Sequence, residues 1–264
     1  MTPVPEPRAA ACLLLVEVGN SHVSIATSSP GRLSAPRRFE NGAHGLVAER
    51  LRRDWRAMPG DRQCAVVLAS VVPEQTTELQ SAIRSDLDTD PMILGDSLPV
   101  PIEYGAVDKE TVGVDRLCAA AAAHHKIQDA CVVAGFGTAI TIDCVDSEGT
   151  FLGGAILPGL QLQARSLHGG TAQLPRVDVR APQAAFGRNT EEAIVNGVVY
   201  GAVGALREIV ERYATELGRW PRLVVTGGGA PLIRETCDFV DDFIPDLVLR
   251  GMALAYREFF ATEA

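Results

Sequence analysis

Aromatic residues are scarce in this chain of 264 residues, since eight Phe, four Tyr and two Trp make up only 5% of it. The core must therefore be packed mainly from Val, Leu, Ile and Ala. Basic residues are also in the minority: the formal net charge is −9, with 24 Lys and Arg against 33 Asp and Glu. A general nucleic-acid binder needs a basic face that displaces counterions, so we expect no nucleic-acid partner. Hydrophobic residues, at 47%, are too abundant for a disordered chain.

Metal-binding, redox and targeting patterns are missing as well. The six cysteines form no CxxC pair, and the five histidines show no metal-ligand spacing. Most cysteines lie in apolar runs, so we expect free, buried thiols in a reducing cytoplasm. The N-terminal segment is rich in proline and lacks the charged-then-apolar order of a signal peptide. Its apolar stretch, residues 9–16, is shorter than the roughly 20 residues that a bilayer requires, so we expect a cytoplasmic protein without a membrane partner.

Apolar runs that end at turn residues predict alternating strands and helices. Residues 1–10 are expected to form a flexible leader. Continuous apolar runs predict buried strands, and longer segments with helical spacing predict helices. The expected strands cover residues 13–18, 23–27, 64–70, 91–94, 130–134, 139–145, 151–157 and 223–226. The expected helices cover residues 45–57, 74–87, 190–217 and about 245–260.

A strand–turn–strand pattern occurs twice, at residues 13–27 and again at residues 130–145. This echo, together with the alternation of strands and helices, predicts a duplicated α/β architecture. One half covers about residues 11–115, with a C-terminal helix at 246–264 packing back on it, and the other covers 116–245. The length agrees, because about 150 residues per domain gives roughly 1.8 domains.

Three glycine turns directly follow apolar strands. Backbone can approach a phosphate closely only where no Cβ intervenes, and the N–H groups of such a turn can point at the anion. Any one of these turns is more simply explained as a hairpin, whereas the three together favour a nucleotide site. None fits the Walker pattern, and no GxGxxG fingerprint opens a helix. The turns are Gly19-Asn20-Ser21, Gly137-Thr138 and Gly227-Gly228-Gly229.

Two acidic positions are candidates for chemistry. Glu17 precedes the first glycine turn, where a carboxylate could contact Mg²⁺ directly or through water, while the alternative is a strand-edge glutamate facing solvent. Asp115 stands before an alanine-rich helical run, so it is either an N-cap or a general base for a substrate hydroxyl. Arg116 beside it could grip a substrate carboxylate with two hydrogen bonds.

Three glycines lie on one face of the long helix, at positions 197, 201 and 204. Each costs roughly 1 kcal/mol against alanine in a helix, so their presence needs a reason. The close approach of another helix, either in the core or across a dimer axis, provides one.

The chain resembles the type III pantothenate kinases, which belong to the superfamily of acetate and sugar kinases, heat-shock ATPases and actin. The similar segments run in the same order over nearly the whole chain. They are Val18–Ser21, Gly113–Arg116, Phe136–Thr141, Leu152–Gly159, Thr171–Pro175, Phe186–Thr190 and Thr226–Gly228. The resemblance implies a duplicated ribonuclease H-like, actin-like ATPase fold with a cleft between two similar halves. It also implies ATP-dependent phosphorylation of pantothenate to 4′-phosphopantothenate, the first step towards coenzyme A, by a homodimer.

The resemblance also implies roles for individual residues. Asp115 would be the base, and Tyr104, Gly113, Val114, Arg116 and, from the partner side of a dimer, Thr190 would contact pantothenate. ATP, with Mg²⁺ held indirectly by Glu17, would be bound by a larger set. That set comprises Glu17, Gly19, Asn20, Ser21, His22, Val23, Ser24, Thr138, Gly227 and Gly228.

Two positions depart from the family pattern. Glu17 stands where the family usually has Asp, which lengthens the side chain by one methylene. Gly135 stands where the family usually has the Asp that holds an activating monovalent cation, K⁺ or NH₄⁺. The enzyme could dispense with the cation, replace its ligand or be less active. The alternative function is therefore a non-catalytic or weakly active homologue that binds nucleotide or pantothenate.

Overall fold

The computed structural model describes residues 12–59 and 64–262, so the predicted leader lies outside the described residues. The described chain divides into two compact units. Unit 1 contains the described residues up to Pro101, Val112–Ala122 and those from Val248 onward. Unit 2 contains Ile102–Thr111 and Ala123–Leu247. Each unit is built around a six-stranded mixed sheet, which confirms the duplicated α/β architecture.

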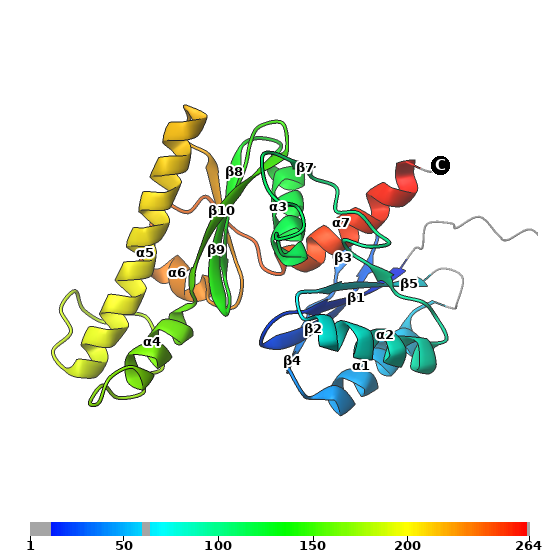
Figure 1. Ribbon diagram of the computed structural model, residues 1–264, viewed down its shortest axis with the longest axis horizontal. Coiled ribbons are helices and arrows are strands. Elements are labelled where there is room, and N and C mark those ends of the chain that lie inside the picture. The colour runs from blue at the N-terminus through cyan, green and yellow to red at the C-terminus, as the bar shows by residue number, and fades with distance from the viewer. Residues whose placement is uncertain (1–11, 60–63, 263–264) are drawn as a thin grey trace, which may run out of the picture. The chain divides into compact units, whose positions relative to one another are not determined.

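In unit 1 the central strand β1 pairs antiparallel with β2 and parallel with β5. Helices α1 and α2 pack side by side against this sheet (Figure 1). The core between them is aliphatic, with Val16, Ile25 and Leu68 fully buried. The first elements are β1 (Cys12–Val18), β2 (His22–Ser29), β3 (Arg32–Leu33), β4 (Arg37–Glu40), α1 (His44–Ala57), β5 (Cys64–Ser70), α2 (Pro73–Leu87) and β6 (Met92–Ile93).

Two further helices, α3 (Val114–Ile127) and α7 (Leu247–Thr262), cross at very short range. The alanines of α3 from Ala119 to Ala123 are buried. A Cβ on Gly251 of α7 would overlap the backbone carbonyl of Cys118. The crossing therefore requires a residue without a side chain at position 251. Helix α7 begins at Leu247, two residues later than predicted.

In unit 2 the strand order is β12-β11-β8-β9-β10-β7. Helices α4, α5 and α6 lie along one face of this sheet (Figure 1). The elements are β7 (Glu103–Tyr104), β8 (Cys131–Phe136), β9 (Ala139–Val145), β10 (Thr150–Pro158), α4 (Leu160–Gly169), α5 (Thr190–Leu217), β11 (Arg222–Thr226), α6 (Ala230–Thr236) and β12 (Asp242–Phe243).

Helix α5 has the ends that the sequence predicts. The side chain of Asn189 accepts a hydrogen bond from the N–H of Glu192 at 2.9 Å, and Gly218 ends the helix with φ of 67°. By length and composition, α5 is the one helix of the described chain that could cross a membrane. Its inner face, however, lies in the core of unit 2, where eight of its residues are buried.

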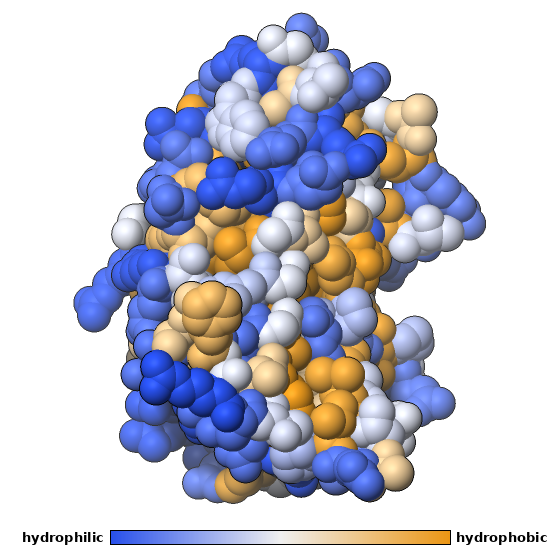
Figure 2. Space-filling model, turned by 90° about the vertical axis from the view of Figure 1, so that its left-hand side faces the viewer, coloured by the Kyte–Doolittle hydropathy of each residue, from blue (hydrophilic) through white to orange (hydrophobic). Residues whose placement is uncertain are grey.

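The outer face of α5 carries the three glycines at positions 197, 201 and 204. All three are exposed, and a Cβ on any of them would meet no atom within 4 Å. The suggestion that they allow close packing in the core is therefore wrong within the described chain. Figure 2 looks onto this side of the molecule and shows apolar and weakly polar surface between charged borders.

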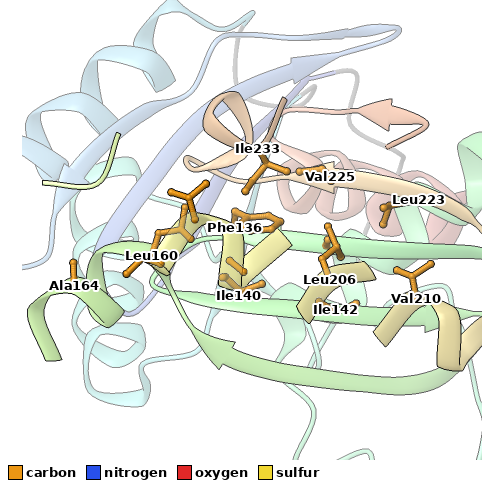
Figure 3. Close-up of a cluster of buried hydrophobic side chains, with 14 of the residues drawn as sticks. Phe136, Ile140, Ile142, Leu160, Ala164, Leu206, Val210, Leu223, Val225 and Ile233 are labelled. Carbon is orange, nitrogen blue, oxygen red and sulfur yellow. The ribbon is translucent and has the colours of Figure 1, made fainter. Parts of the chain in front are cut away.

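The core of unit 2 is formed where α5 lies over the central strands. Leu206 and Val210 of α5 pack over Ile142 of β9, while Phe136 of β8 lies near Leu160 (Figure 3). Most buried side chains here are aliphatic, as the low aromatic content predicts. Successive side chains of a strand point to opposite faces of the sheet. Gly135, Thr141 and Asp143 therefore lie on the face opposite this cluster.

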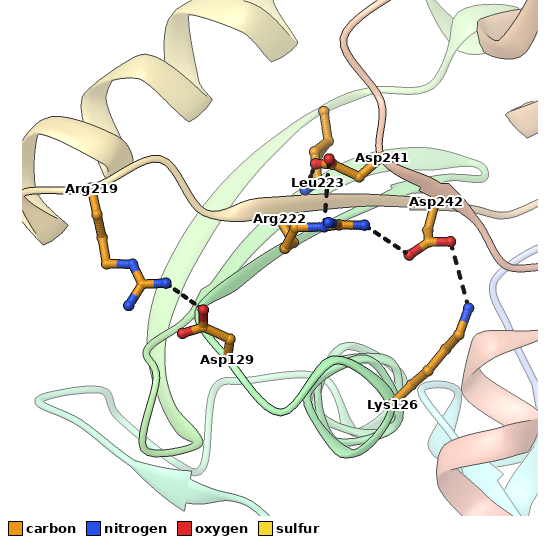
Figure 4. Close-up of polar contacts among 7 residues, drawn as sticks. All are labelled: Lys126, Asp129, Arg219, Arg222, Leu223, Asp241 and Asp242. Carbon is orange, nitrogen blue, oxygen red and sulfur yellow. Dashed lines mark hydrogen bonds and ion pairs between the residues drawn. The ribbon is translucent and has the colours of Figure 1, made fainter.

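A network of charges joins α3 to the edge of the same sheet. Arg222 of β11 pairs with Asp241 and Asp242, and Lys126 of α3 also pairs with Asp242 (Figure 4). Asp241 additionally accepts the N–H of Leu223 at 2.7 Å. The ion pairs are partly exposed, so each contributes about 0–1 kcal/mol at most.

Candidate active site

The first glycine turn joins β1 to β2 in unit 1. The N–H of Gly19 donates to the carbonyl of His22 at 3.0 Å, which closes the turn around Asn20 and Ser21. Asn20 and His22 are exposed and Ser21 is half-buried. Exposed backbone in a glycine turn is suited to binding an anion.

The predicted contacts at positions 23 and 24 lie inside the sheet. Val23 and Ser24 are both buried in β2, and Val23 belongs to the hydrophobic core of unit 1. A ligand at the turn could reach these two residues only through their backbone.

Glu17 lies on the central strand of unit 1, between Ser24 of β2 and Ala69 of β5. The alternative of a strand-edge glutamate is therefore wrong. Its side chain is half-buried, two residues before Gly19. A carboxylate beside an exposed glycine turn is the kind of donor that Mg²⁺ takes together with phosphate oxygens, so this position fits the expected metal.

Asp115 is the second residue of α3, so the N-cap alternative is wrong. Its Oδ1 accepts the backbone N–H of Arg116 at 2.9 Å. A Cβ on Gly113 would lie 2.5 Å from the same Oδ1, so glycine is needed there for the carboxylate to fold over the start of the helix. The Gly-Val-Asp-Arg motif thus sets the position of one carboxylate.

Burial raises the pKa of Asp115, while the N–H and the positive charge of Arg116 oppose this shift. The thiol of Cys118, one turn further along α3, also has a raised pKa, through burial and then through the negative charges of Asp115 and Glu17. The two carboxylates therefore both lie within electrostatic reach of one buried thiol. The structure brings Glu17, Gly113 and Asp115 into one region of unit 1.

The other two glycine turns lie at strand ends in unit 2. Gly227 follows β11 with φ of 94°, and a Cβ there would lie 2.5 Å from the carbonyl oxygen of Phe136. The N–H of Gly229 donates to the same oxygen at 2.9 Å. Thr138 is exposed at the β8–β9 turn, and its carbonyl accepts the N–H of Gly159 at 3.0 Å. Gly228 is exposed. These turns share one end of the sheet.

Gly135 of β8 is paired with Thr141 of β9 and Thr226 of β11. A Cβ at position 135 would lie 2.9 Å from Oγ1 of Thr141. Asp143 is fully buried but is paired with Val133, two positions along the strand, so it does not occupy the register position of residue 135. Gly135 has no side-chain oxygen, so position 135 cannot supply the carboxylate that would bind a monovalent cation.

The remaining predicted residues lie on other elements of unit 2. Tyr104 is half-buried on β7, with the Lys109 ammonium 4.3 Å from its ring centroid. Thr190 is exposed at the first position of α5.

Sequence reasoning missed Asn41, which follows β4 and contacts the first glycine turn. Its Nδ2 donates to the carbonyl of Gly19 at 2.9 Å, and its backbone N–H donates to the carbonyl of Ser21 at 3.0 Å. The only local signal was the Asn41-Gly42 pair, which indicates a turn but not its partner 22 residues earlier.

Solved structures place this arrangement in a known class of fold. MreB 5 of Spiroplasma citri, bound to AMPPNP, matches with a TM-score of 0.52 and 11% identity, covering 98% of this chain and 99% of that chain. A protein from Campylobacter jejuni assigned to the Baf family of transcriptional activators matches with a TM-score of 0.61 and 20% identity, covering 93% and 98%. The chain has the duplicated, actin-like ATPase fold that the resemblance implied.

Sequence comparison then identifies the family. A family model described as type III pantothenate kinase matches residues 13–212. A type III pantothenate kinase from Dehalococcoides mccartyi is 32% identical over 255 residues, covering 93% of this chain and 97% of the relative. The chain belongs to the type III pantothenate kinase family, as the motifs predicted.

Proposed function

We propose that this protein transfers the γ-phosphoryl group of ATP to pantothenate, forming 4′-phosphopantothenate, the first step of coenzyme A biosynthesis. The observation that carries the proposal is the Gly-Val-Asp-Arg motif in a chain that belongs to the family over most of its length. In this motif Gly113 makes room for the carboxylate of Asp115, and burial raises the pKa of that carboxylate towards the range useful for a base.

Asp115 is proposed to accept the proton of the primary hydroxyl of pantothenate. The hydroxyl oxygen then forms a bond to the γ-phosphorus, the bond from that phosphorus to the β–γ bridging oxygen breaks, and ADP leaves. Phosphoryl transfer of this kind depends mainly on positioning and charge stabilisation. Mg²⁺ bound with ATP would supply neutralising charge.

ATP would be held by two groups of residues. In unit 1 the backbone of the Gly19–Ser21 turn and of His22 would contact phosphate, with Glu17 directed to the metal through water. In unit 2 Thr138, Gly227 and Gly228 would contact the nucleotide. The exposure of Asn20, His22, Thr138 and Gly228 supports this assignment.

Pantothenate would be bound by Gly113–Arg116, with Arg116 pairing with its carboxylate, and by Tyr104. Thr190 would reach the substrate of the partner subunit. A homodimer is therefore part of the proposal, and the exposed outer face of α5 supports it. Phe186, just before that helix, is 84% exposed, and Tyr200, on the helix itself, is 43% exposed, which is unusual for aromatic side chains on a protein without a partner. The proposed location is the cytoplasm.

The expected monovalent cation does not fit position 135, because glycine provides no carboxylate there. We therefore propose that turnover does not depend on K⁺ or NH₄⁺ through this position. Replacing Gly135 with Asp would add the carboxylate but would require Thr141 to move, since its Oγ1 lies 2.9 Å from the new Cβ.

The test is to incubate the purified protein with ATP, Mg²⁺ and pantothenate, with Na⁺, K⁺ or NH₄⁺, and to measure 4′-phosphopantothenate. Product formation at similar rates in all three salts is the expected result. A folded protein that forms no product in any salt would contradict the proposal. If that protein still bound Mg²⁺–ATP, the result would support the non-catalytic homologue, the alternative based on the departures from the family pattern at Gly135 and Glu17.

A further inference from the structure

The carbonyl groups of the phosphate-binding turn are held by a residue from a distant part of the chain. Asn41 contacts the turn twice, through Nδ2 to the carbonyl of Gly19 at 2.9 Å and through its backbone N–H to the carbonyl of Ser21 at 3.0 Å. Strand β4 brings it there, because β4 pairs with β2 and places Glu40 opposite His22. Asn41 is thus the first residue past the end of the paired strands.

These two contacts determine which way the backbone of the turn points. The peptide unit is planar and trans, so its N–H points away from its C=O. When the Gly19 carbonyl is directed at Asn41, the N–H of Asn20 in the same peptide unit points away from Asn41. Asn20 is exposed, so its N–H is available to an anion on the side opposite Asn41. The side chain of Asn41 therefore fixes the orientation of an N–H donor without facing the ligand itself.

The side-chain oxygen of Asn41, Oδ1, shows that this orientation of the amide lowers stability. Among the described residues, Oδ1 of Asn41 is the one buried side-chain oxygen or nitrogen atom without a hydrogen-bond partner. Rotating the amide by 180° would place Oδ1 against the carbonyl oxygen of Gly19. The hydrogen bond from Nδ2 to Gly19 therefore leaves Oδ1 without a partner among the described residues. A buried polar atom without a partner lowers stability, and such groups call for a functional explanation.

We propose that Asn41 is a positioning residue for ATP: it holds the Gly19–Ser21 turn in the conformation that binds phosphate. This inference rests on the proposed function, because it assumes that the turn binds ATP. It adds a residue outside the motifs that carry the family resemblance. A group retained only for stability would not leave a buried acceptor unpaired.

Two variants separate positioning from stability. Asn41→Ala removes the donor and the unpaired acceptor together, so its melting temperature is expected to stay within a few degrees of the parent's. Its dissociation constant for Mg²⁺–ATP is expected to rise about tenfold, because the N–H of Asn20 is no longer held towards phosphate and most of one hydrogen bond to a charged group is lost. Asn41→Asp keeps the shape but places a carboxylate against the Gly19 carbonyl and adds a negative charge beside the turn. It is expected to weaken ATP binding further.

Ser34→Ala is the matched control. Ser34 Oγ accepts the N–H of Thr27 at 2.9 Å, so it holds the same strand β2 at the end far from the turn. This variant is expected to lose some stability and to bind ATP like the parent.

Binding is measured by calorimetry with ATP and Mg²⁺ alone, and turnover is measured with pantothenate added. In the Asn41 variants KM for ATP should rise while KM for pantothenate stays within about twofold of the parent value. Unchanged ATP binding in both variants, in a parent protein that binds ATP and makes product, would overturn only the role of Asn41. The role of Asn41 would also be overturned if Asn41→Ala lost much stability and if its affinities for ATP and for pantothenate fell equally. A parent protein that binds no ATP would overturn both this role and the proposed function.

Discussion

At the scale of single residues, Asp115 is the group whose chemistry depends most on its surroundings. Asp115→Asn keeps the shape of the side chain and removes the base. We expect kcat to fall by about 100-fold or more, because general-base catalysis is typically worth 10²–10⁴-fold. Binding of Mg²⁺–ATP should be retained, which calorimetry would check. Full turnover in a folded Asp115→Asn protein would show that another group accepts the proton.

The raised pKa of Asp115 also predicts how kcat and stability depend on pH. A base acts only when deprotonated, so kcat should fall as the pH drops through the raised pKa of Asp115. Its effect on stability has the opposite direction. A carboxyl group with a higher pKa in the folded state contributes stability below its ordinary pKa, near 4, and loses that contribution as the pH rises through the raised value.

At neutral pH the ionised Asp115 is therefore destabilising, and Asp115→Asn should melt at a higher temperature than the parent. The difference should shrink as the pH approaches about 4, where the parent carboxyl becomes neutral. Thermal denaturation of both proteins from pH 4 to 8 measures this. An equal or lower melting temperature for Asp115→Asn at neutral pH would argue against burial as the main cause of the shift.

The cysteines give a second test at this scale. Cys118, Cys131 and Cys144 are buried, and burial raises the pKa of the Cys131 and Cys144 thiols to about 12 and about 11. Since the thiolate is the reactive form, these three should not react with a thiol reagent near neutral pH. The native protein should therefore expose at most three of its six thiols to rapid labelling, and all six after denaturation. Rapid native labelling of Cys118, detected by mass spectrometry, would contradict the packing of α3.

At the scale of elements, the crossing of α3 and α7 depends on Gly251. Gly251→Ala would place a methyl group against the backbone of Cys118, which cannot yield as a flexible side chain can. We expect a loss of about 1–3 kcal/mol in the free energy of unfolding, the usual range for overpacking. Urea denaturation measures it. The control is Gly45→Ala in α1, where a Cβ meets nothing within 4 Å and alanine should be neutral or mildly stabilising.

The sequence predicts the elements better than it predicts their neighbours. Strand β5 and helix α5 lie where the apolar run and the capping residues place them, because both signals are local. Asn41 could not be predicted to contact Gly19, since 22 residues and a strand pairing separate them. The sequence indicates Glu17 as a candidate metal contact. Its place on a central strand, however, follows only from the pairing of β1 with β5, which lies about 50 residues away.

The same limit explains the outcome for the candidate site. The positions of Gly113 and Asp115 follow from four consecutive residues, so their arrangement is encoded locally. The electrostatic effect of Glu17 on the pKa of Cys118 depends on where the start of α3 lies relative to β1, and no short motif specifies that.

At the scale of the whole molecule, the outer face of α5 predicts the oligomeric state. In an isolated chain Gly201 is exposed and a Cβ there meets no atom within 4 Å, so a larger residue would fit without strain. If α5 forms the proposed dimer through its glycine face, a larger residue would hold the two backbones apart. Gly201→Arg would then add like charges on both sides of the two-fold axis as well.

The parent protein is therefore expected to have the mass of a dimer in size-exclusion chromatography with light scattering, and Gly201→Arg the mass of a monomer. Gly45→Arg, at an exposed position of α1 in unit 1, should remain dimeric. Because Thr190 is proposed to serve the partner's substrate, the Gly201→Arg monomer should also lose affinity for pantothenate more than for ATP. A Gly201→Arg protein that stays dimeric and fully active would exclude this face as the interface. In that case no close packing would explain the three glycines, each of which costs about 1 kcal/mol in a helix relative to alanine.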